Sequence, residues 1–187
     1  NSISVRDYTT ENLVFQVTGK HPQIVLDPTL LANWEVNVDS PVKKKDYILF
    51  YYCEHLPVHI KTQIFDYAHK NGLAVYGAGD SDKDYDECTV NLTPEEWVAM
   101  FKNARFVFTG TFHGVIFSIL NHRLFKVYLT NKGRIAKVGN LLSYFSIKDR
   151  EIDNHYIFDL EKQRSEIDYA SIDRIIDKQR LESLNYL

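Results

Sequence analysis

Cysteine, glycine and proline are scarce in this sequence, and each shortage excludes a class of protein. The chain of 187 residues holds only Cys53 and Cys88, which are too few for a disulfide scaffold and favour a reducing cytosol. With eight glycines and five prolines, collagen-like repeats are excluded, and a hydrophobic content of 44% argues against disorder. We therefore expect a folded chain with a substantial core.

An excess of one charge and long apolar runs are also missing. The chain has 22 basic and 25 acidic residues, a net charge of −3, whereas a nucleic-acid binder usually carries a strongly basic face. No apolar run reaches the roughly 18 residues that a membrane span needs, and no signal-peptide pattern opens the sequence. We expect a cytoplasmic protein that binds no nucleic acid.

Methionine occurs once, at Met100, and the chain opens with an apolar run over residues 3–5. We expect a fragment or a processed product, so a site that another domain completes would look incomplete. Residues 32–46 contain Pro41 and three lysines, 43–45, without helical or strand periodicity. We expect a linker there, with the lysines in a solvated hinge.

From Tyr47 onward, predicted strands alternate with predicted helices. The strands are expected at residues 47–53, 73–76, 105–109 and 124–129. The helices are expected from Pro57 to Gly72, from the capping box Thr93–Glu96, and at 115–120, 135–145 and 168–184. This alternation predicts an α/β fold, a Rossmann-like parallel sheet with helices on both faces. Ligands of such sheets lie outside the carboxyl ends of the strands.

His113 lies where such a ligand would bind, in a Gly-Thr-Phe-His-Gly segment between a strand and an apolar helix. Gly110 and Gly114 permit close backbone approach and unusual dihedral angles. A helix start attracts anions, and a bound polyanion would favour the imidazolium form, which makes His113 a candidate proton donor. The alternative is a structural histidine, hydrogen-bonded at a helix cap.

Two arginines are candidate anion ligands. Arg6 follows the first apolar run, and the alternative there is that Asp7 caps a helix while Arg6 pairs with it on the surface. Arg134 follows the predicted strand 124–129, together with Asn131, and guanidinium groups bind anions bidentately. The alternative for Arg134 is a basic residue on a solvated helix face.

Three further motifs lack a residue that their chemistry requires. The glycines of residues 77–79 resemble a dinucleotide fingerprint, but Asp82 stands where the third glycine belongs. The alternating acids of residues 80–86 lack the central glycine of a calcium loop, and we expect a solvated acidic loop. No second ligand cluster accompanies Cys53, His55 and His59, so we expect no metal.

An ordered set of short motifs resembles the polysaccharide pyruvyl transferase family. They are SVRD (4–7), DPTLL (27–31), TPEEW (93–97), NARFVFT (103–109), TFHG (111–114) with Ser118, and Asn131 with residues 134–135. Each motif alone is weak, but the ordered set is specific. Some members of the family have arginine at the position of Phe112, and if that arginine helps to bind the donor, this chain must use another group.

The resemblance implies a GT-B-type protein, in which two Rossmann-like domains face a cleft. Residues 1–31 would be the remnant of the first domain, 32–46 the linker, and 47–187 the second domain. The implied reaction transfers the pyruvyl unit of phosphoenolpyruvate onto two hydroxyls of one sugar in polysaccharide or exopolysaccharide biosynthesis. The acceptor would be a sugar or a lipid-linked oligosaccharide, which allows peripheral attachment at the inner face of the membrane.

The resemblance also assigns roles to residues. His113 would transfer the proton, and Arg6 would clamp the donor across the cleft. Both residues would be catalytic. Thr111, Gly114, Asn131 and Arg134 would help to bind substrate, without metal or cofactor, and the missing first domain would complete the site.

Two other functions remain open. A glycosyltransferase of the same architecture would use a nucleotide-sugar donor, whose diphosphate suits the same helix start. A non-catalytic carbohydrate-binding module would use some of the 12 tyrosines and 11 phenylalanines, although core packing explains most of these aromatics better.

Overall fold

A computed structural model describes residues 2–35, 37–43, 46–53, 55–79, 81–163 and 167–187. Two compact units emerge from the contacts: Asn1–Trp34 with Asp168–Leu187 form unit 1, and Glu35–Ile167 form unit 2. Lys44 and Lys45 of the lysine run and Asp80 of the acidic loop lie outside the described residues. Among the helices that are described, none is both long and apolar enough to cross a bilayer.

Unit 1 begins with a strand, a helix and a parallel strand: β1 (Ser4–Val5), α1 (Tyr8–Thr18) and β2 (Gln23–Ile24). Asp7 caps α1, because its carboxylate accepts the Thr10 N–H at 2.8 Å. The structure therefore agrees with the alternative interpretation of this segment, in which Asp7 caps a helix. The sequence did not predict the extent of α1, since this helix buries no residue and so lacks a clear apolar stripe.

The last helix also belongs to unit 1, which differs from the expected domain of residues 47–187. Unit 1 contains α2 (Pro28–Leu31) and α8 (Tyr169–Tyr186). Ser183 accepts the Leu26 N–H at 2.9 Å, and the Arg180 guanidinium donates to the Leu30 carbonyl at 2.9 and 3.0 Å. Such pairs join residues about 150 positions apart, so they cannot be predicted from local sequence patterns. That unit 1 is the end of a first Rossmann-like domain stays a prediction.

Unit 2 is built on the predicted parallel sheet. Its strands are β3 (Tyr47–Tyr51), β4 (Ala74–Ala78), β5 (Glu87–Thr89), β6 (Phe106–Thr109) and β7 (Phe125–Val127). They lie in the order β5-β4-β3-β6-β7, and every pairing is parallel. After β3 the chain adds β4 and β5 on one side of this strand, and it then crosses over to add β6 and β7 on the other side. The strand order reverses between β3 and β6, the position where such sheets bind ligands.

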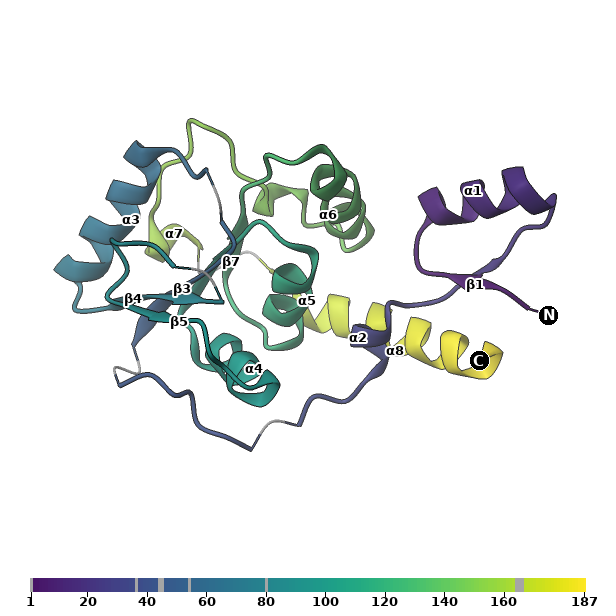
Figure 1. Cartoon of the computed structure of the whole chain (residues 1–187), viewed down its shortest axis with the longest axis horizontal. Coiled ribbons are helices and arrows are strands. Elements are labelled where there is room, and N and C mark those ends of the chain that lie inside the picture. Colours follow the sequence, from purple (N-terminus) through teal and green to yellow (C-terminus); the bar gives the residue numbers. More distant parts are fainter. Residues whose placement is uncertain (1, 36, 44–45, 54, 80, 164–166) are drawn as a thin grey trace. The chain divides into compact units, whose positions relative to one another are not determined.

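Helices cover both faces of this sheet, as predicted. They are α3 (Val58–Lys70), α4 (Pro94–Asn103), α5 (Phe112–Leu120), α6 (Lys132–Tyr144) and α7 (Leu160–Gln163), with a 3₁₀ turn at Lys148–Arg150. Ile48 and Phe50 share a core cluster with α3 residues. On the opposite face, the Tyr47 hydroxyl donates to the Met100 carbonyl of α4 at 2.8 Å. Figure 1 shows the strands between α3 and α4.

The main deviations in unit 2 occur around turns. β3 ends at Tyr51, two residues earlier than predicted, because Tyr52 has a φ of 46° and leaves the extended conformation. The three-residue strand β5 was not predicted, because it follows an acidic loop without an apolar run. The linker has no helix or strand in its described residues, although Ser40 and Val42 are buried.

Candidate functional site

The carboxyl ends of β3 and β6 meet at a crowded backbone junction. The Gly110 N–H donates to the Tyr52 carbonyl at 3.1 Å, and the Tyr128 N–H donates to the Thr109 carbonyl at 3.1 Å. A Cβ on Gly110 would lie 2.7 Å from the Tyr52 carbonyl oxygen and 3.0 Å from that of Tyr128. Gly110 is therefore needed where three backbone segments converge.

The start of α5 is held by its own side chains. Thr111 caps the helix by accepting the Gly114 N–H at 3.0 Å, and the Thr109 hydroxyl lies 3.2 Å from that of Thr111. A Cβ on Gly114 would fall 2.1 Å from the Thr109 hydroxyl oxygen. Thr111 and Gly114, both predicted to bind substrate, thus hold the helix start.

These contacts correct the expected role of the two glycines. Gly110 and Gly114 could adopt unusual dihedral angles, but the described glycines with positive φ are Gly19, Gly72 and Gly79. The close approach that both glycines permit is to the chain's own atoms. Their absent side chains therefore allow this junction to pack.

His113 is exposed on the first turn of α5. Its ring lies edge-on to Phe112 at 5.6 Å between centroids, and none of the described residues hydrogen-bonds to its imidazole. The alternative of a hydrogen-bonded cap histidine does not describe it, because Thr111 makes the cap. His113 is thus available to a ligand at the reversal point of the sheet.

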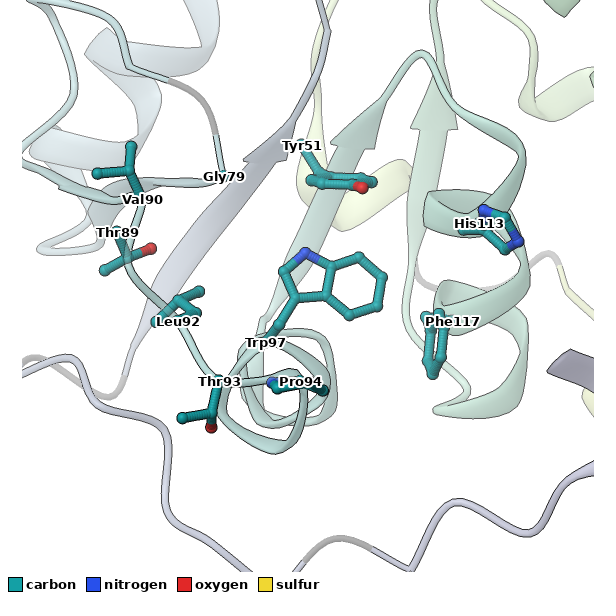
Figure 2. Close-up of a pocket in the computed structure, with 10 residues that line it drawn as sticks. All are labelled: Tyr51, Gly79, Thr89, Val90, Leu92, Thr93, Pro94, Trp97, His113 and Phe117. Atoms are coloured by element: carbon teal, nitrogen blue, oxygen red, sulfur yellow. The ribbon is translucent and has the colours of Figure 1, made fainter.

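A cavity of about 400 Å³ opens beside His113. Three of its walls are aromatic: Tyr51 at the end of β3, Trp97 on α4 and Phe117 on α5 (Figure 2). Its other described lining residues are Gly79, Thr89, Val90, Leu92, Thr93 and Pro94. The lining is apolar with few polar groups, which is typical of small-molecule sites.

Arg6 is turned toward a carboxylate within unit 1. Its Nη1 donates to Asp27 Oδ2 at 2.6 Å, whereas its Nε lies 4.0 Å from Asp7. Burial of Asp27 tends to raise the pKa of its carboxyl, but hydrogen bonds from Thr29 and Arg6 and the charge of Arg6 hold this pKa below its usual value. Arg6 belongs to unit 1 and His113 to unit 2, so the predicted clamp across a cleft stays a prediction.

Asn131 and Arg134 lie at the start of α6. Asn131 caps this helix, because its Oδ1 accepts the N–H groups of Gly133 and Arg134 at 2.9 and 3.3 Å. Helix α6 follows β7 as α5 follows β6, so both helix starts face the carboxyl edge of the parallel sheet. Arg134 is half-buried. Its contact with substrate, like that of Asn131, stays a prediction.

A second cavity, of about 420 Å³, adjoins the acidic loop and includes Lys61 and Asp82 in its lining. Lys61 Nζ donates to Asp82 and Asp84, both at 2.7 Å. Burial tends to lower the pKa of Lys61, but the hydrogen bonds and charges of these two carboxylates raise it above its usual value. The acidic loop is therefore tied to α3 through Lys61, while most of its described residues are exposed, as expected of a solvated loop.

In the part of the chain that the structure describes, no three His, Cys, Asp or Glu side chains cluster to hold a metal ion. The candidates for zinc make other contacts. His59 Nε2 lies 2.8 Å from the Asn154 carbonyl oxygen, and Cys53 belongs to the core cluster under α3.

Comparison with known proteins assigns the family. A model of the polysaccharide pyruvyl transferase family matches residues 1–123, about two thirds of the chain. The chain belongs to the polysaccharide pyruvyl transferase family. The match contains Arg6 and His113, and it ends before Asn131 and Arg134.

One solved structure resembles this pyruvyl transferase family member, and no curated protein matches it. The structure is described as the glycotransferase of kitacinnamycin, with a TM-score of 0.53 and 9% identity. The alignment covers 86% of this chain and 45% of that chain. At this identity the likeness supports the GT-B-like α/β fold alone.

The aromatic cavity is the part of the site that the sequence did not predict. The abundance of aromatics indicates core packing, but Tyr51 and Trp97 are only half-buried and line the cavity with Phe117. One local signal was present: the capping box of α4 places Trp97 on the first turn of that helix. The meeting of three elements could not be predicted from local patterns.

Proposed function

We propose that the complete protein transfers the pyruvyl unit of phosphoenolpyruvate onto two hydroxyls of one sugar, forming a cyclic ketal and releasing phosphate. The family membership supports a transferase that acts in polysaccharide synthesis. The observation that carries the proposal is the position of His113, exposed at the reversal point of the sheet and beside a cavity. The acceptor is a sugar or a lipid-linked oligosaccharide, and no cofactor is required. Cytoplasmic location stays a prediction.

The reaction needs two hydroxyl protons to move. A proton added to the methylene carbon of phosphoenolpyruvate makes the neighbouring carbon electrophilic, and the first sugar hydroxyl attacks this carbon and loses its proton. The carbon–oxygen bond to phosphate then breaks, and the second hydroxyl attacks the same carbon. One hydroxyl proton ends on the new methyl group and the other on the released phosphate.

His113 is proposed as the group that gives and takes these protons. An imidazole changes its charge near neutral pH, so it suits both directions of transfer. The positive end of α5 offers a partial charge to the donor, whose phosphate and carboxylate carry about three negative charges. Arg6 and Arg134 are proposed to clamp these groups. Thr111, Gly114 and Asn131 hold the two helix starts in place.

The replacement of His113 by alanine tests the proposal. We expect His113→Ala to lower kcat by roughly 100-fold or more, the usual contribution of a positioned acid or base. The measurement is phosphate release from phosphoenolpyruvate by the complete protein, with ketal formation followed by mass spectrometry. His155→Ala is the matched control, because His155 is exposed and lines neither cavity. Near wild-type kcat in His113→Ala would end the assignment.

A glycosyltransferase with a nucleotide-sugar donor is the second candidate, because a helix start beside an aromatic cavity also suits a nucleotide diphosphate. Product analysis separates the two reactions. Ketal formation consumes phosphoenolpyruvate and adds a pyruvyl mass, whereas glycosyl transfer releases a nucleotide. A non-catalytic carbohydrate-binding module would bind sugar and produce neither change.

A further inference from the structure

We propose that the cavity beside His113 binds the acceptor sugar, with the sugar ring against Trp97 and its hydroxyls facing the Trp97 indole N–H and the His113 imidazole. This inference rests on the proposed function and identifies where its neutral substrate lies. The supporting features are the angles between the aromatic walls, the polar groups that face the cavity, and the charges of its lining.

The aromatic walls stand at steep angles to each other. Tyr51 and Trp97 have ring centroids 5.0 Å apart and an interplanar angle of 69°, and Trp97 and Phe117 are 4.8 Å apart at 87°. A flat nucleobase gains most from parallel faces that enclose it. A pyranose ring carries C–H groups on both faces and around its edge, so it can contact walls that meet at such angles. The geometry favours a sugar over a base.

The side chains of Trp97 and His113 offer polar groups to a ligand in this cavity. Trp97 is half-buried, and none of the described residues accepts a hydrogen bond from its indole N–H. An indole N–H can donate one hydrogen bond, and a sugar hydroxyl in the cavity would accept it. His113 likewise makes no hydrogen bond to the described residues.

The threonine hydroxyls in the lining already have partners. Thr93 accepts the Glu96 N–H at 3.2 Å, and Thr89 donates to the Gly77 carbonyl at 2.7 Å. New polar contacts in the cavity are therefore expected mainly at Trp97 and His113.

The charges of the cavity lining favour the neutral acceptor sugar over the anionic donor. None of the described lining residues is a lysine or an arginine, so the lining provides no cationic side chain for the donor, which has about three negative charges. A neutral sugar needs no such counter-charge. His113 belongs both to the cavity lining and to the first turn of α5, so a sugar in the cavity would bring its hydroxyls next to the proton-transferring imidazole.

The Trp97 wall is fixed before any ligand binds. The backbone N–H of Trp97 donates to the Thr93 carbonyl at 2.9 Å within the first turns of α4, and the Trp97 ring packs on Phe101 at 4.6 Å between centroids. A side chain held in this way loses little conformational entropy on binding, which favours recognition of a small ligand.

The indole N–H signals in NMR spectra provide a direct test. The chain contains two tryptophans, Trp34 and Trp97, so two such signals are expected from the ¹⁵N-labelled chain, and Trp97→Phe identifies one of them. The probes are methyl β-glucopyranoside, methyl β-galactopyranoside and the methyl glycoside of N-acetyl-β-glucosamine, each without phosphoenolpyruvate. We expect at least one to shift the Trp97 signal saturably at millimolar concentration. The Trp34 signal should not move, because Trp34 is not among the residues that line this cavity.

The catalytic assay of the complete protein adds a second readout. Trp97→Leu should raise the KM for the acceptor at least about tenfold, since it removes both the ring face and the N–H, and should leave the KM for phosphoenolpyruvate within about twofold. Trp97→Phe, which keeps a ring face, should have an intermediate effect. Trp34→Phe is the matched control and should match the wild type.

Three results would overturn the inference. They are no shift of the Trp97 signal with any glycoside up to about 50 mM, a range that covers weak millimolar binding; a saturable shift with phosphoenolpyruvate alone; and a saturable shift with uridine diphosphate at lower concentrations than with any glycoside. If a glycoside shifts the Trp97 signal but the protein consumes no phosphoenolpyruvate, the sugar site is supported and the proposed reaction is rejected. The two failures are therefore distinguishable.

Discussion

Asp27 shows how one buried carboxylate organises charge in unit 1. It is only 5% exposed and accepts hydrogen bonds from Arg6 Nη1 at 2.6 Å and from the Thr29 N–H at 3.0 Å. Its pKa lies below the usual value in the folded protein. The stabilisation from ionised Asp27 is therefore present above the unfolded-state pKa of about 4, and it is lost as the pH falls through the lower folded-state pKa.

Asp27→Asn tests this contribution. We expect the free energy of unfolding at pH 7 to fall by about 1–3 kcal/mol, because the variant loses a charged hydrogen bond to Arg6. The loss should be smaller at about pH 3, where the wild type is also losing this contribution. In a Trp97→Phe background, urea unfolding can be followed by the fluorescence of Trp34, whose indole donates to the Thr29 carbonyl at 2.8 Å.

Asp177→Asn is the control for the Asp27 experiment. Asp177 pairs with Arg180 at 3.2 Å but is 73% exposed, so its removal should change the free energy of unfolding by less than about 0.5 kcal/mol. Equal stability of Asp27→Asn and the wild type at pH 7 would contradict a stabilising role for the Arg6–Asp27 pair.

At the scale of elements, the helix starts at the sheet edge depend on small side chains and caps. Thr111 caps α5 and Asn131 caps α6, and in each helix a glycine follows the cap residue within three positions. The capping box of α4 was predicted from Thr93 and Glu96 and is confirmed in the structure. Capping is predictable because it involves residues only a few positions apart.

Gly114→Ala should destabilise the protein by about 1–3 kcal/mol, because the added methyl group would overlap the Thr109 hydroxyl. Gly139 is the matched control within a helix, since a Cβ there would meet no atom within 4 Å. Gly139→Ala should raise stability by up to about 1 kcal/mol, the difference in helix propensity. Thermal or urea unfolding measures both, and a neutral Gly114→Ala variant would show that the junction can relax.

At the scale of the whole chain, the two units differ in how much they bury. Unit 2 surrounds a five-stranded sheet with a buried core, whereas unit 1 has a two-stranded sheet and a helix, α1, with no buried residue. A two-stranded sheet is marginally stable on its own. Local stability should therefore differ between the units.

Hydrogen exchange should reveal this difference. We expect the amides of α1 to exchange at least about 100-fold faster than those of α5, because little buried surface opposes local opening of α1. Helix α8, which buries Ile172, Ile176 and Ser183, should lie between them. Mass spectrometry of peptides from the labelled chain gives the rates, and protection of α1 equal to that of α5 would contradict the expectation.

The sequence by itself determined the features that depend on neighbours along the chain. The apolar run of β3, the cap of α4 and the strand-glycine-histidine-helix segment around His113 predicted a parallel α/β sheet, and the ordered motifs indicated the family. The family match and the sheet confirm these predictions. His113 could be identified as a candidate site residue from the sequence, because the strand end and the helix start that point to it lie within a few residues of it.

Only the tertiary structure decided which distant residues meet. It brought Tyr51, Trp97 and Phe117 around one cavity with His113, paired Arg6 with Asp27, and placed α8 in unit 1. Helix periods and caps arise from interactions across a few residues, so a linear sequence displays them. Cavities and long-range ion pairs arise from the packing of whole elements, which strand order and side-chain shape determine together.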